Sequence, residues 1–427
     1  MKILLLGSGG REHAIAWKLL QDDPSIDLVV APGNPGISTL GRCVQVTPTD
    51  AAAVVALALD EAPDLIVIGP EGPLAAGVSD ALRLAAFRVF GPSQAAAQLE
   101  SSKRFAKEVM LAAQVPTAPA SWHSDARSAK AALAARGAPV VIKACGLAAG
   151  KGVIVAQTVE EGEDAIDQIL GGLFGSAGSE VLVEEFMAGE ELSLFAVTDG
   201  EHFVMLPPAQ DHKRLLEGDR GPNTGGMGAY SPVAIANRDV LEATALHVIT
   251  PTLAEMRRRG TPFRGLLYVG LMLTDDGPKV VEFNCRFGDP ETQVVLPMLR
   301  SSLLALLVGA STEGGLAATG ELSLRDGAAV TTVVASPGYP DAPRTGAPIA
   351  LPAVPEGVLI FHAGTSRDTE GVLTTSGGRV FAVTAVATTF EGAQRASVET
   401  AEAIEFSGRV LRRDIGWREQ ARLAGTA

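Results

Sequence analysis

Short apolar runs alternate with Ala-rich helical stretches through the first hundred residues of the chain. The apolar runs fall at residues 3–6, 28–31 and 65–68, and helix-forming stretches such as 51–60 separate them. Strands that alternate with helices in this way are typical of a parallel, doubly wound sheet. We therefore predict a Rossmann-like N-terminal domain over residues 1–100, and we expect it to bind a substrate.

Loops rich in Gly and Pro follow the predicted strands of this domain. They occupy residues 7–12, 32–36, 69–73 and 91–93. The carboxyl ends of parallel strands lie at one edge of the sheet, which is where open α/β sheets bind ligands. We therefore expect a ligand site at the edge that these loops share.

The first of these loops, Gly-Ser-Gly-Gly-Arg-Glu at residues 7–12, follows a strand and opens a helix. It departs from the dinucleotide-binding fingerprint because Glu12 replaces the last glycine, and the next strand ends at Pro32, where a ribose-binding acid is expected. The pattern therefore disfavours an NAD site. A helix N-terminus beside Arg11 still favours an anion such as a phosphate.

Three further regions follow residue 100. A helix with basic residues, two β-rich segments and a Gly-rich loop predict a small lid over residues 101–191. Longer strands and an Asn/Gly-rich loop predict a larger unit over residues 192–325, and residues 326–427 are again β-rich. The fold class that we predict is α/β and α+β multidomain, with a doubly wound parallel sheet first and a β-rich C-terminal domain last.

Composition narrows the function classes. At 427 residues the chain has room for roughly two to four domains. A net charge of −14, with no basic cluster longer than residues 257–259, argues against binding to nucleic acid. The apolar runs are too short to span a bilayer, and a Gly-rich loop stands where a signal cleavage site is expected, so we expect a cytoplasmic protein. Cys43, Cys145 and Cys285 show no Cys-x-x-Cys spacing, which argues against disulfides and zinc.

A strand-borne lysine, Lys143, leads into a loop of small residues at 146–152. Small side chains let backbone amides approach a polyphosphate, and lysines neutralise its charge. The loop is not a P-loop, because its first two glycines are one residue too close and a further glycine follows Lys151. A plain hairpin turn is the structural alternative.

Acidic and amide side chains end two other apolar strands. Residues 183–191 (Val-Glu-Glu-Phe-Met-Ala-Gly-Glu-Glu) suit adenine recognition by backbone and ribose recognition by a carboxylate, although a solvated turn has the same composition. Within residues 280–291, strand alternation places Glu282 and Asn284 on one face as oxygen ligands for Mg²⁺. Arg286 follows on the same side and can neutralise a transferred phosphoryl group; a structural ion-pair cluster is the alternative.

The segment 211–214 (Asp-His-Lys-Arg) precedes a glycine-rich loop at 221–232 (Gly-Pro-Asn-Thr-Gly-Gly-Met-Gly-Ala-Tyr-Ser-Pro). So many glycines in a polar stretch predict a loop that approaches a ligand closely, with an ordinary surface loop as the alternative. His212 lies within this motif, but we do not expect it to be a catalytic base. His13 and His362 lie in apolar or Gly-bounded settings that suit structural roles equally well.

Taken in order, these motifs resemble the phosphoribosylamine–glycine ligase family, also called glycinamide ribonucleotide synthetases, of the ATP-grasp superfamily. The matching motifs include Gly-x-Gly-Gly-Arg-Glu-His, Gly-Leu-Ala-Ala-Gly-Lys-Gly, Thr-Gly-Gly-Met-Gly-Ala-Tyr-Ser-Pro, Glu-Phe-Asn-x-Arg-Phe-Gly-Asp-Pro-Glu and Phe-His-Ala-Gly-Thr. The resemblance covers residues 5–365, and Arg-Arg-Asp-Ile-Gly-Trp at 412–417 extends it. Cys145 stands where the family usually has Asp; because Cys is neutral, we expect nucleotide binding to persist while the hydrogen bonds of the loop differ.

The resemblance implies an ATP-grasp lid over residues 101–191 and an ATP-grasp large subdomain with a metal site over residues 192–325. It also implies ATP-dependent ligation of glycine to 5-phosphoribosylamine through glycyl phosphate, in the second step of purine (IMP) biosynthesis. The implied cofactors are ATP, as co-substrate, and Mg²⁺ or Mn²⁺. The implied partners are the two small-molecule substrates, with no nucleic acid and no membrane, and a transient contact with the upstream amidotransferase stays open.

The resemblance also implies roles for individual residues. Those implied for catalysis are Arg286, Lys143 and Asp289. Those implied for ATP are Lys103, Lys143, Gly146, Gly150, Lys151, Gly152, Glu184, Glu185, Phe186 and Glu191. Those implied for the substrates are Gly10, Arg11, Glu71, Asp211, Asn223, Thr224, Gly225, Met227, Asp289 and Arg379, and those implied for the metal are Glu282 and Asn284.

Two other hypotheses stay open. A formate- or bicarbonate-using purine carboxylate ligase, or a biotin-type carboxylase, shares the lysines and the metal strand, but the loop 221–232 favours the glycine ligase. The second is a catalytically inactive nucleotide-binding regulator. Loss of Lys143, Glu282, Asn284 or Arg286 would favour the regulator, and all of them are present.

Overall fold

The computed structural model describes residues 1–147 and 152–425 of the chain. Its N-terminal part is a five-stranded parallel sheet with the strand order β3-β2-β1-β4-β5. The strands are β1 (Lys2–Gly7), β2 (Asp27–Pro32), β3 (Arg42–Cys43), β4 (Leu65–Ile68) and β5 (Val89–Phe90). The strand order reverses between β1 and β4, and in open α/β sheets such a switch point opens a crevice at the carboxyl ends of the strands.

Helices cover both faces of this sheet. They are α1 (Gly10–Asp22), α2 (Ala51–Glu61), α3 (Glu71–Ala75) and α4 (Val78–Leu84). In β1, Ile3 and Leu5 pack in one hydrophobic cluster with α1, whereas Leu4 and Leu6 pack in another with α2 and α4. All four side chains are fully buried, which explains why this strand is apolar without interruption.

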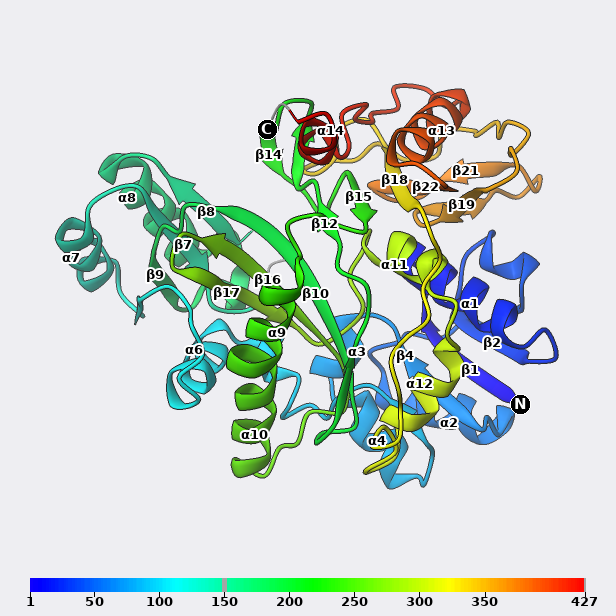
Figure 1. Ribbon diagram of the computed structural model, residues 1–427, viewed down its shortest axis with the longest axis horizontal. Helices are drawn as coiled ribbons and strands as arrows, with labels where there is room; N and C mark the ends of the chain where they lie inside the picture. Colours follow the sequence, from blue (N-terminus) through cyan, green and yellow to red (C-terminus); the bar gives the residue numbers. More distant parts are fainter. Residues whose placement is uncertain (148–151, 426–427) are drawn as a thin grey trace.

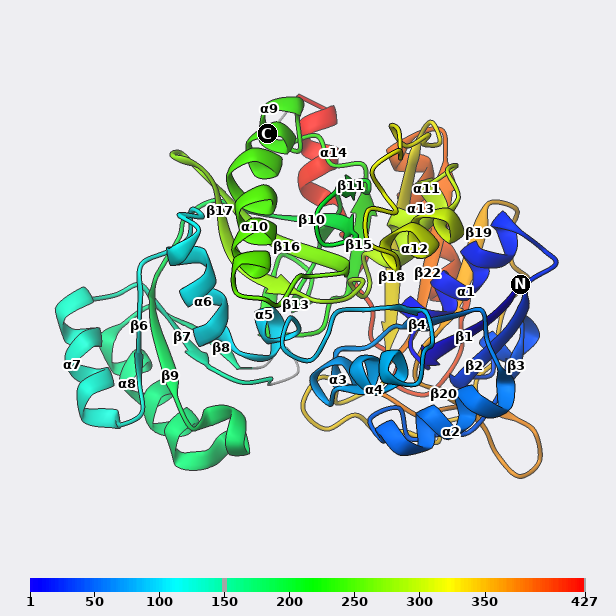
Figure 2. The same cartoon turned by 90° about the horizontal axis from the view of Figure 1, so that it is seen from below.

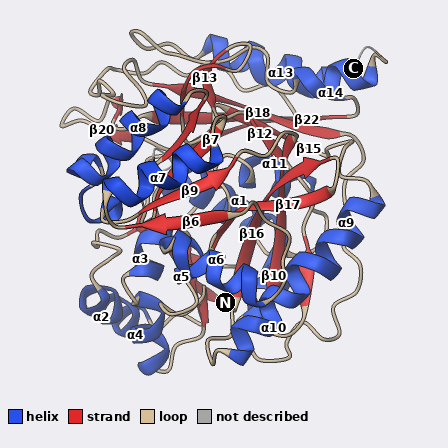
Figure 3. Cartoon of the chain, turned by 90° about the vertical axis from the view of Figure 1, so that its left-hand side faces the viewer, coloured by secondary structure: helices blue, strands red, loops and turns tan. Residues whose placement is uncertain are grey.

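A four-stranded antiparallel sheet with the order β6-β9-β7-β8 lies within residues 101–191, the region predicted to be a lid, and is seen at the left of Figure 1. We keep the name lid for this region. Its elements are β6 (Ala120–His123), α7 (Ala126–Arg136), β7 (Val140–Ala144), β8 (Val153–Ala156), α8 (Val159–Gln168) and β9 (Val181–Glu185). Leu133 of α7 and Ile166 of α8 pack against Val140 and Ile142 of β7 in a core of the lid's own. The two helices thus lie on the outer side of the sheet (Figure 3).

A second antiparallel sheet, with the order β11-β10-β16-β17, lies at the centre of the molecule. Its strands are β10 (Glu190–Thr198), β11 (Phe203–Met205), β16 (Gly265–Thr274) and β17 (Gly277–Asn284). The helices that pack around it are α5 (Gln98–Ser101), α6 (Lys103–Ala112), α9 (Arg238–Thr244) and α10 (Thr250–Arg258). Alternation along β17 buries Phe283 in the core and leaves Glu282 and Asn284 on the opposite face.

The third large sheet has the order β12-β15-β18-β22-β19. Its strands are β12 (Gln210–Asp211), β15 (Gly228–Ser231), β18 (Ala328–Ala335), β19 (Val358–His362) and β22 (Arg379–Ala387). The helices α11 (Thr292–Met298) and α13 (Phe390–Ala403) pack on it, whereas α12 (Leu303–Ala310) packs against α1, β10 and β5. Two of its strands therefore come from the middle of the chain and three from beyond residue 325.

The three large sheets and the lid form one assembly in which the N-terminal sheet lies beside the C-terminal one (Figures 1 and 2). The parallel N-terminal sheet, the antiparallel central sheets and the β-rich C-terminal part confirm the predicted α/β and α+β fold class. None of the helices in the two described ranges combines the length and the apolar character that crossing a bilayer requires.

Candidate functional site

A cavity of about 520 Å³ lies where the lid, strand β17 and the edge of the N-terminal sheet meet. The predicted site residues that line it are Arg11, Glu71, Lys103, Lys143, Gly152, Asp211, Thr224, Gly225, Glu282, Asn284, Arg286, Asp289 and Arg379. Apart from Lys103 and Arg379, they come from the loops 7–12 and 69–73, from Lys143 and its loop, and from the motifs at 211–232 and 280–291, whereas the segments 183–191 and 412–417 contribute none. The structure therefore joins motifs that are far apart in the chain into one site.

Other predicted residues lie outside this lining. They are Gly10, Gly146, Glu184, Glu185, Phe186, Glu191, Asn223 and Met227. Met227 is fully buried, and its backbone amide donates to the carbonyl of His212 at 2.7 Å, so it packs beneath the cavity wall. Gly150 and Lys151 were predicted to hold ATP and lie outside the described residues.

One end of the cavity is lined by lysines. Lys143, on β7, and Lys107, on α6, both form ion pairs with the buried carboxylate of Glu184, on β9. Lys103 begins α6 and donates to the carbonyl of Gly146 at 3.4 Å. Burial lowers the pKa of Lys103, although the nearby carboxylate of Glu282 opposes that shift. These cations are placed to neutralise a polyphosphate.

The wall beside these lysines is apolar. Met110 of α6, Leu182 of β9 and Val153 of β8 line it. Such a surface suits the flat ring of a nucleobase, because apolar side chains exclude water from both faces of the ring. The neighbouring amide of Glu185 already donates to the carbonyl of Pro119 at 3.0 Å. The Glu185 amide is therefore not free to bind a base.

Glu282 and Asn284 project into the cavity from β17. Burial raises the pKa of Glu282, but the ammonium groups of Lys213, Lys103 and Lys143 outweigh burial and lower it, so its carboxylate is ionised. Within residues 1–147 and 152–425, neither side chain makes a hydrogen bond to protein.

This pair fits a magnesium ion that is shared with substrate. Mg²⁺ prefers oxygen ligands and is usually held by one or two carboxylates together with substrate phosphates. In the described part of the chain, no group of three or more His, Cys, Asp or Glu side chains is arranged to hold a metal alone. A carboxylate and an amide oxygen on one strand face supply the protein's share of such a site.

Arg286 lies two residues beyond β17, and its guanidinium bridges two carboxylates. Its Nε lies 3.1 Å from Glu71 of α3, and its Nη2 lies 3.1 Å from Glu100 of α5. Burial raises the pKa of Glu71, but Arg286 and Arg11 lower it to about 2. Arg286 therefore joins the central sheet to the N-terminal domain at the mouth of the predicted crevice.

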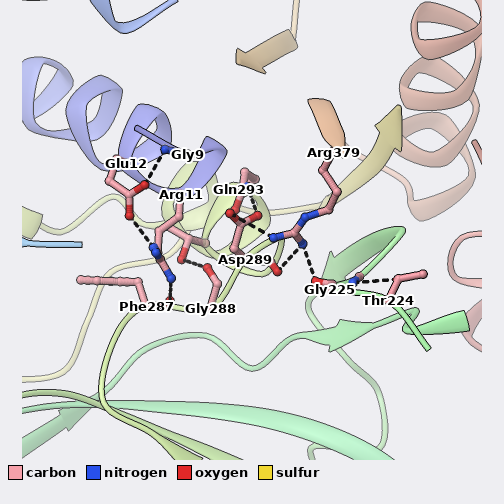
Figure 4. A network of polar contacts seen from close by, with 12 residues as sticks. Gly9, Arg11, Glu12, Thr224, Gly225, Phe287, Gly288, Asp289, Gln293 and Arg379 are labelled. Carbon is pink, nitrogen blue, oxygen red and sulfur yellow. Dashed lines mark hydrogen bonds and ion pairs between the residues drawn. The ribbon is translucent and has the colours of Figure 1, made fainter. Parts of the chain in front are cut away.

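Asp289 and Arg379 also line the cavity, and Figure 4 shows the polar contacts that join them. Arg379 lies 3.4 Å from the Asp289 carboxylate through Nη2, and its Nη1 donates to the Asp289 carbonyl at 2.6 Å and to the carbonyl of Gly225. The Gln293 amide donates to the other Asp289 oxygen at 2.8 Å. These hydrogen bonds fix the Asp289 carboxylate and the Arg379 guanidinium side by side, an arrangement that suits a substrate with both a donor and an anionic group.

The loop that opens α1 is satisfied internally. The carboxylate of Glu12 accepts from the Gly9 amide at 2.7 Å and from Nε of Arg11 at 2.5 Å, and Arg11 also donates to the carbonyl of Phe287 at 3.1 Å (Figure 4). A Cβ on Gly69 would meet the Glu12 side chain at 2.3 Å, which explains the glycine there. Glu12 thus takes the place that an anionic ligand would occupy at the Gly9 amide.

A second cavity of about 420 Å³ adjoins the first, and both are lined by Asp289 and Arg379. Its remaining lining consists of small or polar residues: Ser8, Gly9, Gly33, Asn34, Ala363, Gly364, Thr365 and Ser376. The Asp289–Arg379 pair therefore lies between the two cavities, and the second extends along the edge between the N-terminal and C-terminal sheets.

Sequence reasoning missed several polar residues of the site. They are Glu100, Lys107, Lys213, Tyr268 and Glu291. Lys213 and Glu291 belong to quoted motifs and Lys107 lies one helical turn beyond Lys103, so their positions offered a signal. Nothing in the sequence marks Tyr268, whose hydroxyl donates to Glu291 at 3.0 Å. Burial lowers the pKa of Lys213, but Asp211 and Glu191 raise it well above its ordinary value, so Lys213 stays charged.

Three family models match the chain. They are described as the N domain, the ATP-grasp (A) domain and the C domain of phosphoribosylglycinamide synthetase, and they match residues 1–100, 101–292 and 329–418. A phosphoribosylamine–glycine ligase of Mesorhizobium japonicum is 50% identical over 424 residues, which cover 99% of each chain.

Solved structures resemble the fold as well. The crystal structure of a phosphoribosylamine–glycine ligase from Thermotoga maritima matches with a TM-score of 0.84 and 35% identity, covering 97% of this chain and 100% of that one. The biotin carboxylase domain of a Hydrogenobacter thermophilus 2-oxoglutarate carboxylase, in complex with MgADP and bicarbonate, matches with a TM-score of 0.70 at 18% identity, covering 96% of this chain and 91% of that one. The second likeness concerns the fold alone.

Proposed function

The chain belongs to the phosphoribosylglycinamide synthetase family, and from this premise we propose that it joins glycine to 5-phosphoribosylamine at the expense of ATP. The products are N1-(5-phosphoribosyl)glycinamide, ADP and phosphate, in the second step of purine (IMP) biosynthesis. The observation that supports this function best is the continuous cavity, in which lysines, two oxygen ligands, Arg286 and the Asp289–Arg379 pair follow one another.

ATP enters at the lysine-lined end. Its adenine packs on the apolar wall of Met110, Leu182 and Val153, and its phosphates lie along Lys103 and Lys143. Glu184 holds Lys143 in place by an ion pair. Cations that are fixed before the substrate binds stabilise developing charge more effectively than mobile ones, because they need not reorganise during the reaction.

Glu282 and Asn284 are the residues that would hold a divalent cation. Bound Mg²⁺, or Mn²⁺ in its place, would neutralise charge on the nucleotide phosphates. The protein's own contribution is to keep Glu282 ionised through the surrounding lysines and to exclude water from the phosphates when the lid covers them.

Glycine is activated as an acyl phosphate. A carboxylate oxygen of glycine bonds to the γ-phosphorus of ATP, and the bond from that phosphorus to ADP breaks. Arg286 faces the cavity beside Glu282 and carries the charge that stabilises the transferred phosphoryl group. Asp211, which also lines this part of the cavity, suits the ammonium group of glycine because its carboxylate is a charge-assisted acceptor.

Phosphoribosylamine approaches from the second cavity. Asp289 and Glu71 orient its amine toward the acyl carbon, while Arg379, with Arg11, faces its phosphoribosyl part. The amine nitrogen bonds to the acyl carbon, phosphate leaves, and the nitrogen gives up its proton. Because both reactants are held in one site, the amine attacks the acyl phosphate directly, and the reaction requires no covalent intermediate with the enzyme.

The test measures ADP release by the purified protein with ATP and Mg²⁺, adding glycine and freshly generated phosphoribosylamine separately and together. We expect release that requires both substrates, with the ribonucleotide product identified by mass spectrometry. Turnover with formate or bicarbonate and another ribonucleotide, but not with glycine, would retain the ATP chemistry and overturn the substrate assignment.

A further inference from the structure

The motif Arg-Arg-Asp-Ile-Gly-Trp at residues 412–417 has no part in the proposed reaction, because none of these residues lines either cavity. Arg412 is nevertheless 0% exposed, and it is among the largest fully buried side chains of the described residues. A buried guanidinium is costly unless every donor is paired. Its partners therefore show what this motif holds in place.

Arg412 holds a hairpin formed by β13 (Arg214–Leu216) and β14 (Arg220–Asn223). Its Nη1 donates to the Arg214 carbonyl at 3.0 Å and to the Asp219 carboxylate at 2.9 Å. Its Nε and Nη2 donate to the two oxygens of Asp414, each at 2.8 Å. Asp414 in turn accepts from the amide of Gly218 at 2.8 Å. The Arg412 side chain is thus hydrogen-bonded to both the start and the turn of the hairpin.

The hairpin needs this support. A two-stranded hairpin is marginally stable by itself in water, and the side chain of Leu216 is 46% exposed, so little apolar burial stabilises it. Its turn also contains Asp219 in the left-handed region at φ 53°, a conformation that costs free energy for a residue other than glycine. Arg418 adds a second contact with Asp219, at 2.7 Å.

The same motif holds the strand that precedes the hairpin. The amide of Gly416 donates to Nε2 of buried His212 at 2.7 Å. Ile415 packs against Gly228 so closely that a Cβ on this glycine would lie 2.5 Å from the Ile415 side chain. The helix α14 (Trp417–Leu423) follows directly and lies beside the hairpin (Figure 1).

Both ends of the hairpin enter the cavity wall. Lys213 precedes β13 and Thr224 follows β14, and both line the cavity. The amide and hydroxyl of Thr224 donate to the carbonyl of Lys213 at 2.7 and 2.8 Å, so the two ends move together. Gly225, the next residue, accepts from Arg379. A shift of the hairpin would therefore displace a cation near Glu282 and a contact of the Asp289–Arg379 pair.

We propose that Arg412 is a positioning residue for the ligase reaction, which acts through Asp219 and the β13–β14 hairpin to fix Lys213 and Thr224 against the substrates. The inference rests on the proposed function for its kinetic readout. It assigns the C-terminal motif to the part of the cavity that Lys213 and Thr224 line, whereas the apolar wall that we assign to adenine comes from α6, β8 and β9.

The test compares Asp219→Asn and Arg412→Met with the matched variant Arg413→Met. Arg413 neighbours Arg412, but its side chain is 62% exposed. Its ion pairs with Glu402 and with Glu217 of the hairpin turn lie at the surface, where such pairs contribute little. We expect Asp219→Asn and Arg412→Met to lower kcat/KM for phosphoribosylamine on the order of 10- to 100-fold, as small misplacements of substrate-positioning groups do. We expect the dissociation constant of a non-hydrolysable ATP analogue, measured without a divalent metal so that Glu282 is not engaged, to change less than about twofold, since the lid is untouched.

Equal losses of ATP-analogue affinity and of kcat/KM would mean a general structural role and overturn the proposal. Wild-type kinetics in folded Asp219→Asn would overturn it as well, and this milder variant decides the matter if Arg412→Met does not fold. Arg413→Met is expected to behave as wild type. If it lowers kcat/KM for phosphoribosylamine as much as Arg412→Met does, the effect does not depend on the buried Arg412, and the proposal is wrong.

Amide hydrogen exchange tests the same inference without turnover. We expect Asp219→Asn to speed exchange at Thr224 and Met227, whose amides bond to Lys213 and His212, while exchange in β7 stays unchanged. Unchanged exchange at both amides would overturn the positioning role. Faster exchange in a protein whose wild type does not ligate glycine would instead show that the proposed function, and not the positioning of the hairpin, is wrong.

Discussion

The guanidinium of Arg286 lies 3.1 Å from the carboxylate of Glu71, although 215 positions separate the two residues in the chain. Arg286 lies two residues after β17, the strand that carries Glu282 and Asn284. Glu71 begins α3 at the carboxyl edge of the N-terminal sheet. This ion pair therefore joins the half of the cavity that suits ATP to the half that suits phosphoribosylamine. An acyl transfer between substrates bound in two domains requires such a junction.

Replacing Arg286 by lysine is expected to lower kcat on the order of 10²- to 10³-fold, because lysine keeps the charge but loses the planar fork that reaches Glu71 and Glu100 together. Steady-state ADP release with both substrates measures the effect. Arg300→Lys is the control, since Arg300 pairs with exposed Asp326 at the surface. A folded Arg286→Lys enzyme with wild-type kcat would contradict the assigned role.

Replacing Glu282 by glutamine is expected to raise the Mg²⁺ concentration needed for half-maximal activity at least about tenfold, because the site loses its one charged protein ligand. A titration of ADP release with Mg²⁺ at saturating ATP measures the shift. Glu313→Gln removes a surface carboxylate that pairs with Arg264 and serves as the control. An unchanged Mg²⁺ requirement in Glu282→Gln would place the metal site elsewhere.

Replacing Glu184 by glutamine removes the buried carboxylate that forms ion pairs with both Lys107 and Lys143. Breaking a buried ion pair in this way typically costs about 3 kcal/mol of the free energy of unfolding, and the KM for ATP should rise because Lys143 is no longer held. Thermal unfolding and steady-state kinetics measure the two effects. Glu180→Gln disrupts the part-exposed pair with Arg104, for which we expect less than about 1 kcal/mol. Equal effects of the two substitutions would argue against a buried, organising role for Glu184.

His13 and His362 link α1 to β19, where the amide of His362 donates to Nδ1 of His13 at 2.8 Å. Burial lowers the pKa of His13 from 6.5 to about 3, with a smaller contribution from His362. The unfolded chain therefore binds a proton below pH 6.5 that the folded protein does not bind until about pH 3. The stabilisation that His13 provides is present above pH 6.5 and is lost as the pH falls through this window.

Between pH 6.5 and 5, His13 should lower the free energy of unfolding of the wild type by about 1.5 kcal/mol. We expect this part of the decrease to be absent in His13→Gln. Chemical unfolding followed at several pH values measures this dependence. His247 is exposed, and His247→Gln is expected to leave the dependence as it is. A His13→Gln protein whose stability falls with pH as steeply as the wild type would show that His13 does not stay neutral in the folded state.

Local patterns predicted much of the fold. The apolar runs of β1, β2 and β4 and the glycine-rich corners after them specify a parallel sheet, because only buried strands are apolar on both faces. Alternation along β17 likewise predicted which side chains face the cavity. By contrast, no local pattern shows that β12 and β15 join β18, because pairing between strands that are far apart in the chain depends on tertiary packing.

The candidate site was predictable where a motif carries its own chemistry, as with Lys143 and Glu282. Glu100 and Tyr268 could not be predicted, because their importance comes from partners that are distant in sequence, Arg286 and Glu291. The loop at the start of α1 shows a further limit: its glycines suggested a phosphate site, yet the Glu12 carboxylate takes up the Gly9 amide. A side chain can satisfy a helix N-terminus as well as a ligand can.

The transfer of oxygen from glycine to phosphate tests the central claim most directly. Glycine labelled with ¹⁸O in both carboxylate oxygens is supplied with ATP, Mg²⁺ and phosphoribosylamine, and the released phosphate is examined by mass spectrometry. Activation of glycine as an acyl phosphate predicts one ¹⁸O atom in phosphate for each molecule of the glycinamide ribonucleotide formed. Unlabelled phosphate alongside the same product would contradict the account.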